Sequence, residues 1–414
     1  MSVRMRGFTS YTKLADALEM VLSKIKQLEP EVVPFERALN RALAEDVVSR
    51  VDLPPFDRAA VDGYAVRAVD TFGATESKPV KLRVVGSVDV GSATRLEVRR
   101  GEAAKVMTGA PMPKGADAVV MVEQTKAEGG HVLVFAKLPP GKNVSARGED
   151  VRRGEVVLEK GRLLRPQEVG MLAATGNIRV KVTRRPRVAI LATGEELRSP
   201  GERLREGEIV DVNSYSLAAA VESCGGLPRR LGAVHDDARS LRRALRRAAK
   251  YDMALISGGS SVGERDLVPD VITELGELLF HGVAIRPGSP TAFGVVGGKP
   301  FFGLPGFPVS ALVAFDMLAR PALRRMQGLP ADRGYPRVRA RLARKISSTL
   351  GRMEIVRVRV REEAGELVAE PIRIAGSGIL SSMTRADGFL TVPEDVEGLK
   401  EGSLVEVELY RWPM

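Results

Sequence analysis

The residues best suited to bind a ligand lie in the stretch Ser257-Gly-Gly-Ser-Ser-Val-Gly263, which directly follows a short apolar run at 253–256. Glycine permits positive φ and lets a ligand approach the backbone closely. Asp266 follows at the expected start of a helix over 267–275. A strand, a Gly/Ser turn and a helix in this order can surround a phosphate with backbone N–H groups. The spacing matches neither G-x-G-x-x-G nor a P-loop. The stretch alone therefore leaves an anion site and a tight βα turn equally open.

Apolar runs that alternate with helical patterns place this stretch in an α/β domain. Strands are expected at 188–191, 231–234, 253–256, 283–285, 292–296 and 301–304, and further helices at 214–224, 239–250 and from Pro308 onward. Strands separated by helices of this length indicate βαβ units. We therefore predict a three-layer α/β/α domain with a mainly parallel sheet and helices on both faces.

Ligands on such sheets bind at the carboxyl ends of the strands. Those ends select Glu196 with its neighbour Glu195, and Asp236. Asp236 has a second interpretation, because a helix dipole favours a carboxylate at its start by ~0.3–1 kcal/mol. Arg286 lies beside a glycine turn at a predicted strand end, where its guanidinium could grip a phosphate.

The apolar pattern before residue 183 predicts a helical or linker region with a small β module inserted in it. Helices are expected at 12–28, from Pro34 to Leu43 and at 166–175, and short β runs occupy 65–150 with a hairpin loop at 128–130. Beyond Gly334 the β pattern returns, which predicts a separate, barrel-like C-terminal β domain. The predicted domains are 1–50 with 148–182, 51–147, 183–328 and 329–414.

Asp62 lies on a loop, 53–64, that two prolines stiffen ahead of the β module. Its residue type favours an Asx turn, and the alternative is a carboxylate held in place for chemistry. Thr108 ends one β run just before a glycine, and Asp150 closes the module. Neither residue is a specific signal alone.

Composition limits the partners. The 414 residues carry a net charge of +11, which indicates an anionic partner or a surface of the kind found in thermophiles. Basic residues are spread along the chain and only 5% of residues are aromatic, which argues against nucleic acid. No apolar run approaches the ~20 residues of a membrane span, and no secretory signal is evident.

The few sulfur and imidazole ligands limit the metal chemistry. One cysteine excludes an internal disulfide and fits a reducing cytoplasm. Three histidines and one cysteine make a zinc or haem site unconvincing. Any metal should therefore be bound through oxygen, as Mg²⁺ is, or arrive with the substrate.

Six motifs in order resemble the molybdopterin molybdenumtransferase family, which includes the C-terminal enzymatic domain of gephyrin. They are Asp62-Gly-Tyr-Ala65, Met107-Thr-Gly-Ala-Pro111, Arg147-Gly-Glu-Asp150, Thr193-Gly-Glu-Glu196, Ser257-Gly-Gly through Val262-Gly263, and Gly303-Leu-Pro-Gly306 with Pro308-Val-Ser310. The resemblance covers nearly the whole chain. A single motif would be weak, whereas six in the same order are specific.

This resemblance implies insertion of molybdate into adenylylated molybdopterin with Mg²⁺, releasing AMP. It also implies a homodimer whose active sites combine both chains, and a contact with the adenylyltransferase of the same pathway. The implied catalytic positions are Asp62, Thr108, Asp150, Glu196, Asp236 and Asp266, of which Glu196, Asp236 and Asp266 would bind the metal. The implied substrate-binding positions are Ser257, Gly258, Gly259, Ser260, Gly263, Arg286, Ser289, Pro305, Gly306, Ser310, Arg357 and Ser377.

The sequence also departs from the family pattern. Gly282 and Ser289 stand where many members have Lys, and Phe307 replaces Asn in a Pro-Gly-Asn-Pro turn. Because two cations are lost from an oxyanion pocket, tungstate is an alternative to molybdate. The competing functions are a molybdopterin adenylyltransferase, which lacks the Asp62 loop, the β module and the last domain, and a non-catalytic molybdopterin-binding or scaffold protein.

Overall fold

The computed structural model describes residues 11–258, 267–372, 376 and 378–412, in two compact units. Unit 1 comprises 1–31, 40–42 and 183–414, and unit 2 comprises 32–39 and 43–182. Within the described part of the chain, no helix is long and apolar enough to cross a membrane.

The core of unit 1 is a six-stranded sheet in the order β16-β13-β17-β21-β20-β18. Its strands are β13 (Arg187–Thr193), β16 (Leu227–Val234), β17 (Met253–Ser257), β18 (Gly276–His281), β20 (Ala292–Val296) and β21 (Lys299–Leu304). The first four strands in that order run parallel, and β20 and β18 are antiparallel. The predicted mainly parallel sheet is therefore confirmed.

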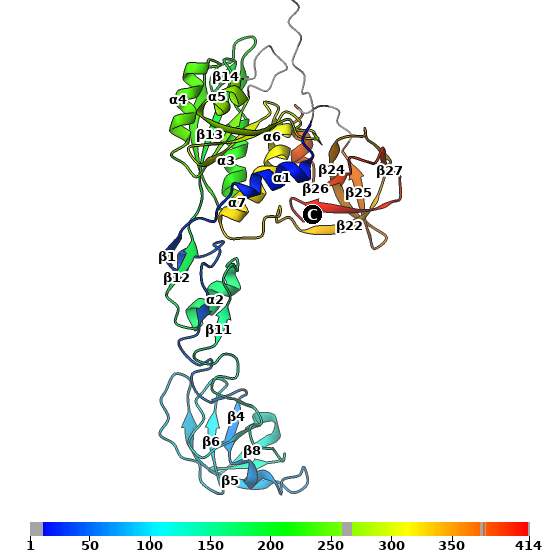
Figure 1. Ribbon diagram of the computed structural model, residues 1–414. Helices are drawn as coiled ribbons and strands as arrows, with labels where there is room; N and C mark the ends of the chain where they lie inside the picture. The colour runs from blue at the N-terminus through cyan, green and yellow to red at the C-terminus, as the bar shows by residue number, and fades with distance from the viewer. Residues whose placement is uncertain (1–10, 259–266, 373–375, 377, 413–414) are drawn as a thin grey trace, which may run out of the picture. The chain divides into compact units, whose positions relative to one another are not determined.

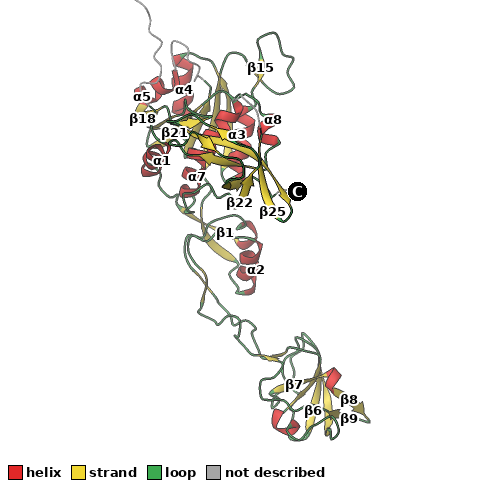
Figure 2. Ribbon diagram, turned by 90° about the vertical axis from the view of Figure 1, so that its right-hand side faces the viewer, coloured by secondary structure: helices red, strands yellow, loops and turns green. Residues whose placement is uncertain are grey.

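Helices cover both faces of this sheet, as Figures 1 and 2 show. They are α1 (Leu14–Ser23), α3 (Asn213–Ser223), α4 (Ala238–Ala248), α5 (Leu267–Leu275), α6 (Pro308–Ala314), a π-helical turn (Phe315–Ala319) and α7 (Arg320–Met326). Alternation along β13 explains the layers, because successive side chains point to opposite faces. Val188 and Ile190 join the core under α3 and α6, whereas Ala189 and Leu191 join the core under α4 and α5.

Two details of the predicted α/β domain are wrong. The expected strand at 283–285 is not in the central sheet; β19 (Ile285–Arg286) pairs instead with a strand of the C-terminal domain. The sixth strand of the sheet is β18, which continues directly from α5 and was not predicted. No turn separates α5 from β18, so the sequence has no turn signal between the helical pattern and the strand pattern. Gly276 is itself the first residue of the strand.

The C-terminal part of unit 1 is a closed five-stranded barrel, which confirms the predicted barrel-like domain. It consists of β22 (Arg337–Leu342), β24 (Met353–Glu363), β25 (Glu366–Pro371), β26 (Gly388–Val392) and β28 (Leu404–Leu409), with β23 (Ile346–Ser347), β27 (Gly398–Leu399) and α8 (Ser381–Thr384) beside it. Pairing of β24 with β26 closes the ring. Full closure leaves the barrel without an exposed edge.

Unit 2 holds the β module, a six-stranded sheet in the order β7-β4-β6-β5-β9-β8. Its strands are β4 (Gly63–Val66), β5 (Val80–Val88), β6 (Glu102–Val106), β7 (Ala118–Met121), β8 (Thr125–Glu128) and β9 (His131–Val134), with short helical turns at Ala68–Thr71 and Val122–Gln124. The hairpin predicted at 128–130 is confirmed by the β8–β9 pairing.

The remainder of unit 2 is the linker region, built from short ladders around one helix. Its elements are β1 (Pro30–Pro34), β2 (Val47–Val48), β3 (Arg58–Ala59), β10 (Val144–Ser145), β11 (Val156–Leu158), α2 (Pro166–Ala174) and β12 (Arg179–Thr183). The helix predicted from Pro34 to Leu43 is wrong, because only Phe35–Arg37 forms a 3₁₀ turn. Asn40 has φ of 59°, a left-handed conformation that ends helical geometry.

Candidate functional site

The carboxyl ends of the parallel strands in unit 1 border a cavity of about 910 Å³. After β13 the chain forms β16 on one side of β13 and then β17 on the other side. The direction in which strands are added therefore reverses between β13 and β17. Open α/β sheets bind ligands in the crevice outside such a reversal point. The cavity is lined there by Thr193, which ends β13, and by Ser257, which ends β17.

Gly258 is the position where this crevice requires a glycine. Its φ is 107°, and a Cβ atom there would lie 2.3 Å from the carbonyl oxygen of Thr193 and 2.7 Å from its Oγ1. Real Cβ atoms do not make such contacts, so β13 and the end of β17 can approach this closely only with glycine. The glycine predicted from the motif is thus explained by packing within the sheet edge.

Three buried polar atoms in the cavity wall have no hydrogen-bond partner among the described residues. They are Thr193 Oγ1, Asn213 Oδ1 and Ser257 Oγ. Leaving such a group unsatisfied in the interior costs roughly 1–3 kcal/mol. Native structures rarely accept this cost without a ligand or water to relieve it. The cavity wall is therefore prepared for a polar ligand.

Two of the predicted carboxylates, Glu196 and Asp236, line this cavity and are exposed. The hydrogen bond that caps α4 comes from the neighbour Asp237, which accepts the Ser240 N–H at 2.8 Å. Asp236 precedes this cap at the start of the helix, where the helix dipole favours a carboxylate. Hydrogen bonding from the side chain of Ser240, followed by that from its backbone N–H, lowers the pKa of the Asp237 carboxyl. The cap and the cavity wall are thus provided by adjacent aspartates.

The other predicted positions on this side divide into three groups. Gly306 lines the cavity, whereas Pro305 and Ser310 are buried and are not part of its lining. Gly259, Ser260, Gly263 and Asp266 lie outside the described residues. Within the described chain, no cluster of three or more Asp, Glu, His or Cys side chains could hold a metal ion.

Arg357 lies in β24, and Arg286 lies in β19, which pairs with β24. Arg286 is exposed and pairs in register with Glu354, in the parallel ladder between β19 and β24. Ser289 closes the turn after Arg286, because its hydroxyl donates to the Ile285 carbonyl at 2.5 Å. Its proton is thereby committed to the backbone. Ser377 lies outside the described residues.

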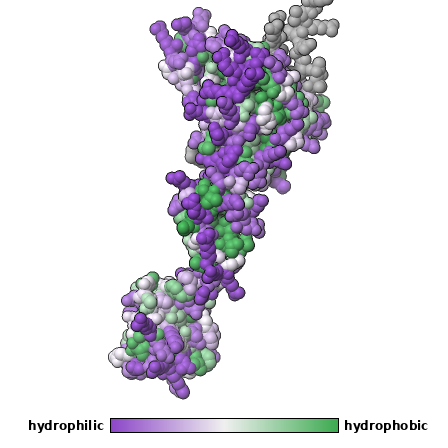
Figure 3. Space-filling model, turned by 60° about the vertical axis from the view of Figure 1, so that its left-hand side comes forward, coloured by the Kyte–Doolittle hydropathy of each residue, from purple (hydrophilic) through white to green (hydrophobic). Residues whose placement is uncertain are grey.

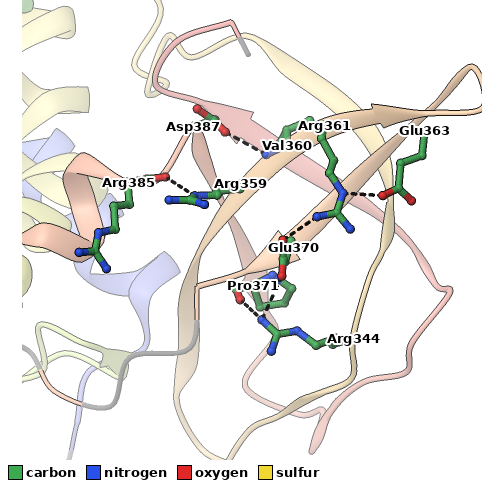
Figure 4. Close-up of polar contacts among 9 residues, drawn as sticks. All are labelled: Arg344, Arg359, Val360, Arg361, Glu363, Glu370, Pro371, Arg385 and Asp387. Carbon is green, nitrogen blue, oxygen red and sulfur yellow. Dashed lines mark hydrogen bonds and ion pairs between the residues drawn. The ribbon is translucent and has the colours of Figure 1, made fainter. Parts of the chain in front are cut away.

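Arg357 is buried and has no ion pair among the described residues, whereas the side chains of the exposed arginines on its strand, Arg359 and Arg361, have hydrogen-bond partners. Figure 4 shows Arg359 donating to the Arg385 carbonyl at 3.3 Å, and Arg361 bonded to Glu363 at 2.6 Å and Glu370 at 2.8 Å. Arg357 is 7% exposed, and its Nε and Nη1 have no partner in the described structure. Burial lowers the pKa of its guanidinium, which Tyr410 and Glu354 oppose. A buried guanidinium with unused N–H groups is suited to an anion.

In unit 2, Asp62 and Thr108 form an exposed pair. Asp62 Oδ1 accepts the Thr108 N–H at 2.6 Å and the Thr108 hydroxyl at 2.8 Å. These two hydrogen bonds lower the pKa of the Asp62 carboxyl, which therefore stays ionised at a lower pH than usual. Asp150 is exposed in a separate turn, where its N–H donates to the Leu53 carbonyl at 3.0 Å.

Sequence reasoning missed the contribution of Asn213 and its neighbours to the cavity. The pattern marked Asn213 only as a helix cap, but it begins α3 and lines the cavity with Asp211. Asp211 accepts the N–H and the hydroxyl of Ser214 and thereby provides the cap. The Asp-Val-Asn spacing is a usable signal, because only one of two cap-type residues this close together is needed for capping.

The chain matches three family models in succession. They are the MoeA N-terminal region (domain I and II) over residues 12–176, a probable molybdopterin binding domain over 189–325, and the MoeA C-terminal region (domain IV) over 339–410.

Several full-length proteins are similar to this chain. A putative molybdopterin biosynthesis protein of Methanocaldococcus jannaschii is 39% identical, over 96% of this chain and 98% of that protein. The molybdopterin molybdenumtransferase of Bacillus subtilis is 34% identical, over 96% and 95%. The crystal structure of the molybdopterin biosynthesis MoeA protein of Pyrococcus horikoshii OT3 has a TM-score of 0.85 and 40% identity, over 97% of this chain and 100% of that one.

Proposed function

Because the chain belongs to the molybdopterin molybdenumtransferase (MoeA) family, we propose that it inserts molybdate into adenylylated molybdopterin, releasing AMP and the finished cofactor. The observation that carries this proposal is the cavity at the β13–β17 crevice, with its three buried polar atoms that lack partners among described residues. Such a site fits a large ligand that carries hydrogen-bonding groups along its length.

The oxyanion is proposed to bind near Arg286 and Arg357. The buried guanidinium of Arg357 supports this assignment, because it offers two N–H groups that the described protein does not use. Electrostatic groups fixed in advance stabilise charge without reorganising during the reaction. Molybdate and tungstate have the same charge and shape, so this site accepts either in principle.

Mg²⁺ is proposed to bind to Glu196 and Asp236, with Asp266 as the third carboxylate. Carboxylate oxygens are suitable ligands, and Mg²⁺ usually takes one or two carboxylates together with phosphate oxygens and water. Glu196 and Asp236 line the same cavity, which supports two of the three assignments. When bound, the ion would neutralise charge on the phosphate oxygens of the substrate.

The direct test is incubation of the protein with adenylylated molybdopterin, Mg²⁺ and either oxyanion, with AMP release as the readout. Oxyanion-dependent release is expected. Tight binding of the substrate without AMP release would instead favour a binding or scaffold protein. Ser289→Lys restores a family cation and should change the ratio of molybdate to tungstate use, and an unchanged ratio would place Ser289 outside the selectivity site.

A homodimer is proposed because unit 2 exposes pairs of apolar side chains. Val48 and Val156 face each other in the β2–β11 ladder, and Val32 and Ile178 lie by the β1–β12 ladder. All four are more than two-fifths exposed. Figure 3 shows apolar surface gathered over this part of unit 2. Contiguous exposed apolar groups mark interaction sites, and a second copy of this chain is the proposed occupant.

We further propose that the active site combines Asp62 of one chain with Glu196 of the other, on the basis of the family resemblance. Asp62→Ala and Glu196→Ala proteins should each be inactive. If the two are co-refolded, about half of the dimers are mixed, and each mixed dimer has one intact site of two. Roughly a quarter of the wild-type activity should therefore return. An inactive mixture that contains proven heterodimers would contradict the shared site.

The adenylyltransferase of the same pathway would supply the substrate, and a contact with it stays an expectation. The competing assignment of this chain as an adenylyltransferase is less favoured, because the regions matched at 12–176 and 339–410 lie outside the molybdopterin binding domain.

A further inference from the structure

Phe307 places an aromatic ring at the cavity where the family pattern has an asparagine. The residue follows β21, lines the cavity and is 62% exposed. Its backbone is fixed, because its carbonyl accepts the Ala311 N–H at 2.9 Å at the start of α6. Its ring lies close to the C-terminal domain, since a Cβ atom at Gly378 would be 3.3 Å from Cδ1 of Phe307. An aromatic ring in this position offers a flat apolar surface to a ligand.

Asn213 presents a hydrogen-bond acceptor in the wall of the same cavity. Its side chain is 7% exposed, and its Nδ2 donates to the Gly306 carbonyl at 2.7 Å. A carbonyl can only accept, so this bond fixes which end of the amide is the oxygen. Oδ1 is buried and has no partner among the described residues. It is therefore available to accept an N–H or O–H from a ligand in the cavity.

The two features are coupled through the backbone, because Gly306 and Phe307 are consecutive. A ligand that satisfies both has a flat face for the ring and an N–H group on its edge. Amino-substituted fused heterocycles have this chemistry. An aliphatic phosphate ester provides no flat face, and an unsubstituted ring provides no exocyclic donor.

We propose that Phe307 and Asn213 form a recognition site for an amino-substituted fused heterocycle, with Phe307 stacking on its face and Asn213 Oδ1 accepting from its amino group. The inference rests on the proposed function, whose substrate contains two such rings, a pterin and an adenine. Phe307 is the specificity-determining residue that distinguishes this chain from the family pattern. Asn213 is the partner that orients the ring.

The test measures binding by calorimetry to full-length protein, with AMP and 6-hydroxymethylpterin as the two ring sources and ribose 5-phosphate as the ligand without a ring. Phe307→Leu should weaken binding of one ring ligand by about ten- to hundredfold, since stacking on an aromatic side chain contributes roughly 1–3 kcal/mol. Phe307→Trp should retain the affinity. Phe307 is largely exposed, so neither change should alter the fold.

The ligand that loses affinity identifies the ring. A loss for AMP alone assigns adenine, and a loss for the pterin alone assigns pterin. The proposal is overturned if Phe307→Leu leaves both affinities unchanged, if ribose 5-phosphate loses as much as AMP, or if wild-type protein binds neither ring.

A ligand series separates recognition by Asn213 from a purely structural role. Purine riboside 5′-monophosphate lacks the amino group of AMP, and lumazine derivatives carry a carbonyl in place of the amino group of pterins. Asn213→Ala should weaken binding of the amino ligand about tenfold more than binding of its counterpart, as expected for one hydrogen bond. Equal losses would show that Asn213 only holds Gly306, and would overturn its assigned role.

The same variants keep this inference distinct from the proposed function. If the ring-dependent losses occur but wild-type protein releases no AMP from the adenylylated substrate, the proposed reaction fails and the recognition site stands. If AMP is released at equal rates and equal half-saturating substrate concentrations by wild-type and Phe307→Leu proteins, the recognition site fails and the reaction stands.

Discussion

Two buried polar clusters in unit 1 differ in whether their hydrogen bonds are satisfied within the described chain. At the β13–β17 crevice, Thr193 Oγ1 and Ser257 Oγ have no partner among described residues. In the π-helical turn, Asp316 is 5% exposed, and its Oδ1 accepts from Arg320 Nε at 2.8 Å and from the Tyr335 hydroxyl at 3.0 Å.

This difference in hydrogen bonding indicates a structural role for the Asp316 cluster and a binding role for the crevice. A satisfied buried network orders the parts that it joins. Here it joins the π-helical turn to the segment that leads into the barrel, and the Arg320 guanidinium also lies 4.4 Å from the centre of the Tyr335 ring. Burial raises the pKa of the Asp316 carboxyl, and Arg320 opposes that shift. The unsatisfied crevice lowers stability and retains its hydrogen-bonding groups for a ligand.

The largest expected effect comes from breaking the satisfied network. Asp316→Ala leaves Arg320 as an uncompensated buried charge, which typically costs about 3–5 kcal/mol. The midpoint of urea unfolding should fall accordingly. In the double variant Asp316→Leu, Arg320→Leu, much of this loss should be recovered, because no isolated charge remains. A double variant as unstable as Asp316→Ala would show that packing, not the charge, carries the effect.

Removing the unpaired guanidinium should affect catalysis and not stability. Arg357→Ala should lower the rate of AMP release by on the order of 10²–10³, the usual loss for one fixed electrostatic group. Its unfolding midpoint should stay equal to wild type or rise, because a buried charge without an ion pair is removed. Arg359→Ala, an exposed arginine two residues further along the same face of the strand, is the matched control and should leave the rate unchanged. A clear loss of stability in Arg357→Ala would indicate an ion pair that anchors the barrel.

Two Thr→Val variants compare a threonine hydroxyl that has a hydrogen-bond partner with one that has no partner among the described residues. Thr183 Oγ1 accepts from Gln27 Nε2 at 3.1 Å, whereas Thr193 Oγ1 has no described partner. Thr183→Val should lower stability by about 1 kcal/mol, since the Gln27 amide loses a partner. Thr193→Val should leave stability equal or slightly higher and weaken substrate binding by about five- to tenfold. Equal destabilisation in both variants would contradict the contrast.

The smallest effect concerns Glu168 in unit 2, a satisfied carboxylate that can be titrated. Hydrogen bonds from Arg165, helped by Arg162, outweigh burial and lower its pKa from 4.5 to about 2. A depressed pKa contributes stability that is present above the unfolded value near 4.5 and is lost as pH falls toward 2.

Glu168→Gln should therefore lower the stability of unit 2 at pH 7, by roughly 1 kcal/mol because both arginines are largely exposed. Melting curves of wild-type and variant protein should converge between pH 4.5 and the acid limit of folding. If the difference in melting temperature between the two proteins stays constant down to that limit, the geometry of the hydrogen bonds and not the charge of Glu168 accounts for the effect.

The sequence by itself determined the layers and most elements. The continuous apolar run Val188–Leu191 is satisfied only by a strand with a core on each face. The ends of α3 and α5 agree with the helical periods within a residue or two. The local rule failed at Pro34–Leu43, where a proline followed by helix-forming residues produced only a 3₁₀ turn.

The candidate site was only partly available in the sequence. Residue type and strand-end position were enough to select Glu196, Asp236 and Gly258, because the carboxyl ends of parallel strands share one edge. Residue type did not specify which of two neighbours has which role, and this was decided by local backbone geometry. Asp237 and not Asp236 caps α4, and Ser289 closes a turn.

Tertiary structure also decided that Arg357 is buried with no ion pair to a described residue, while Arg361, on the same strand, bonds to two glutamates. The physical reason is that burial and hydrogen-bond partners arise from contacts between distant segments. A local pattern specifies a residue's strand and face, but it does not specify what lies opposite that face. The unpaired atoms that mark the binding site therefore appear only when the segments are packed together.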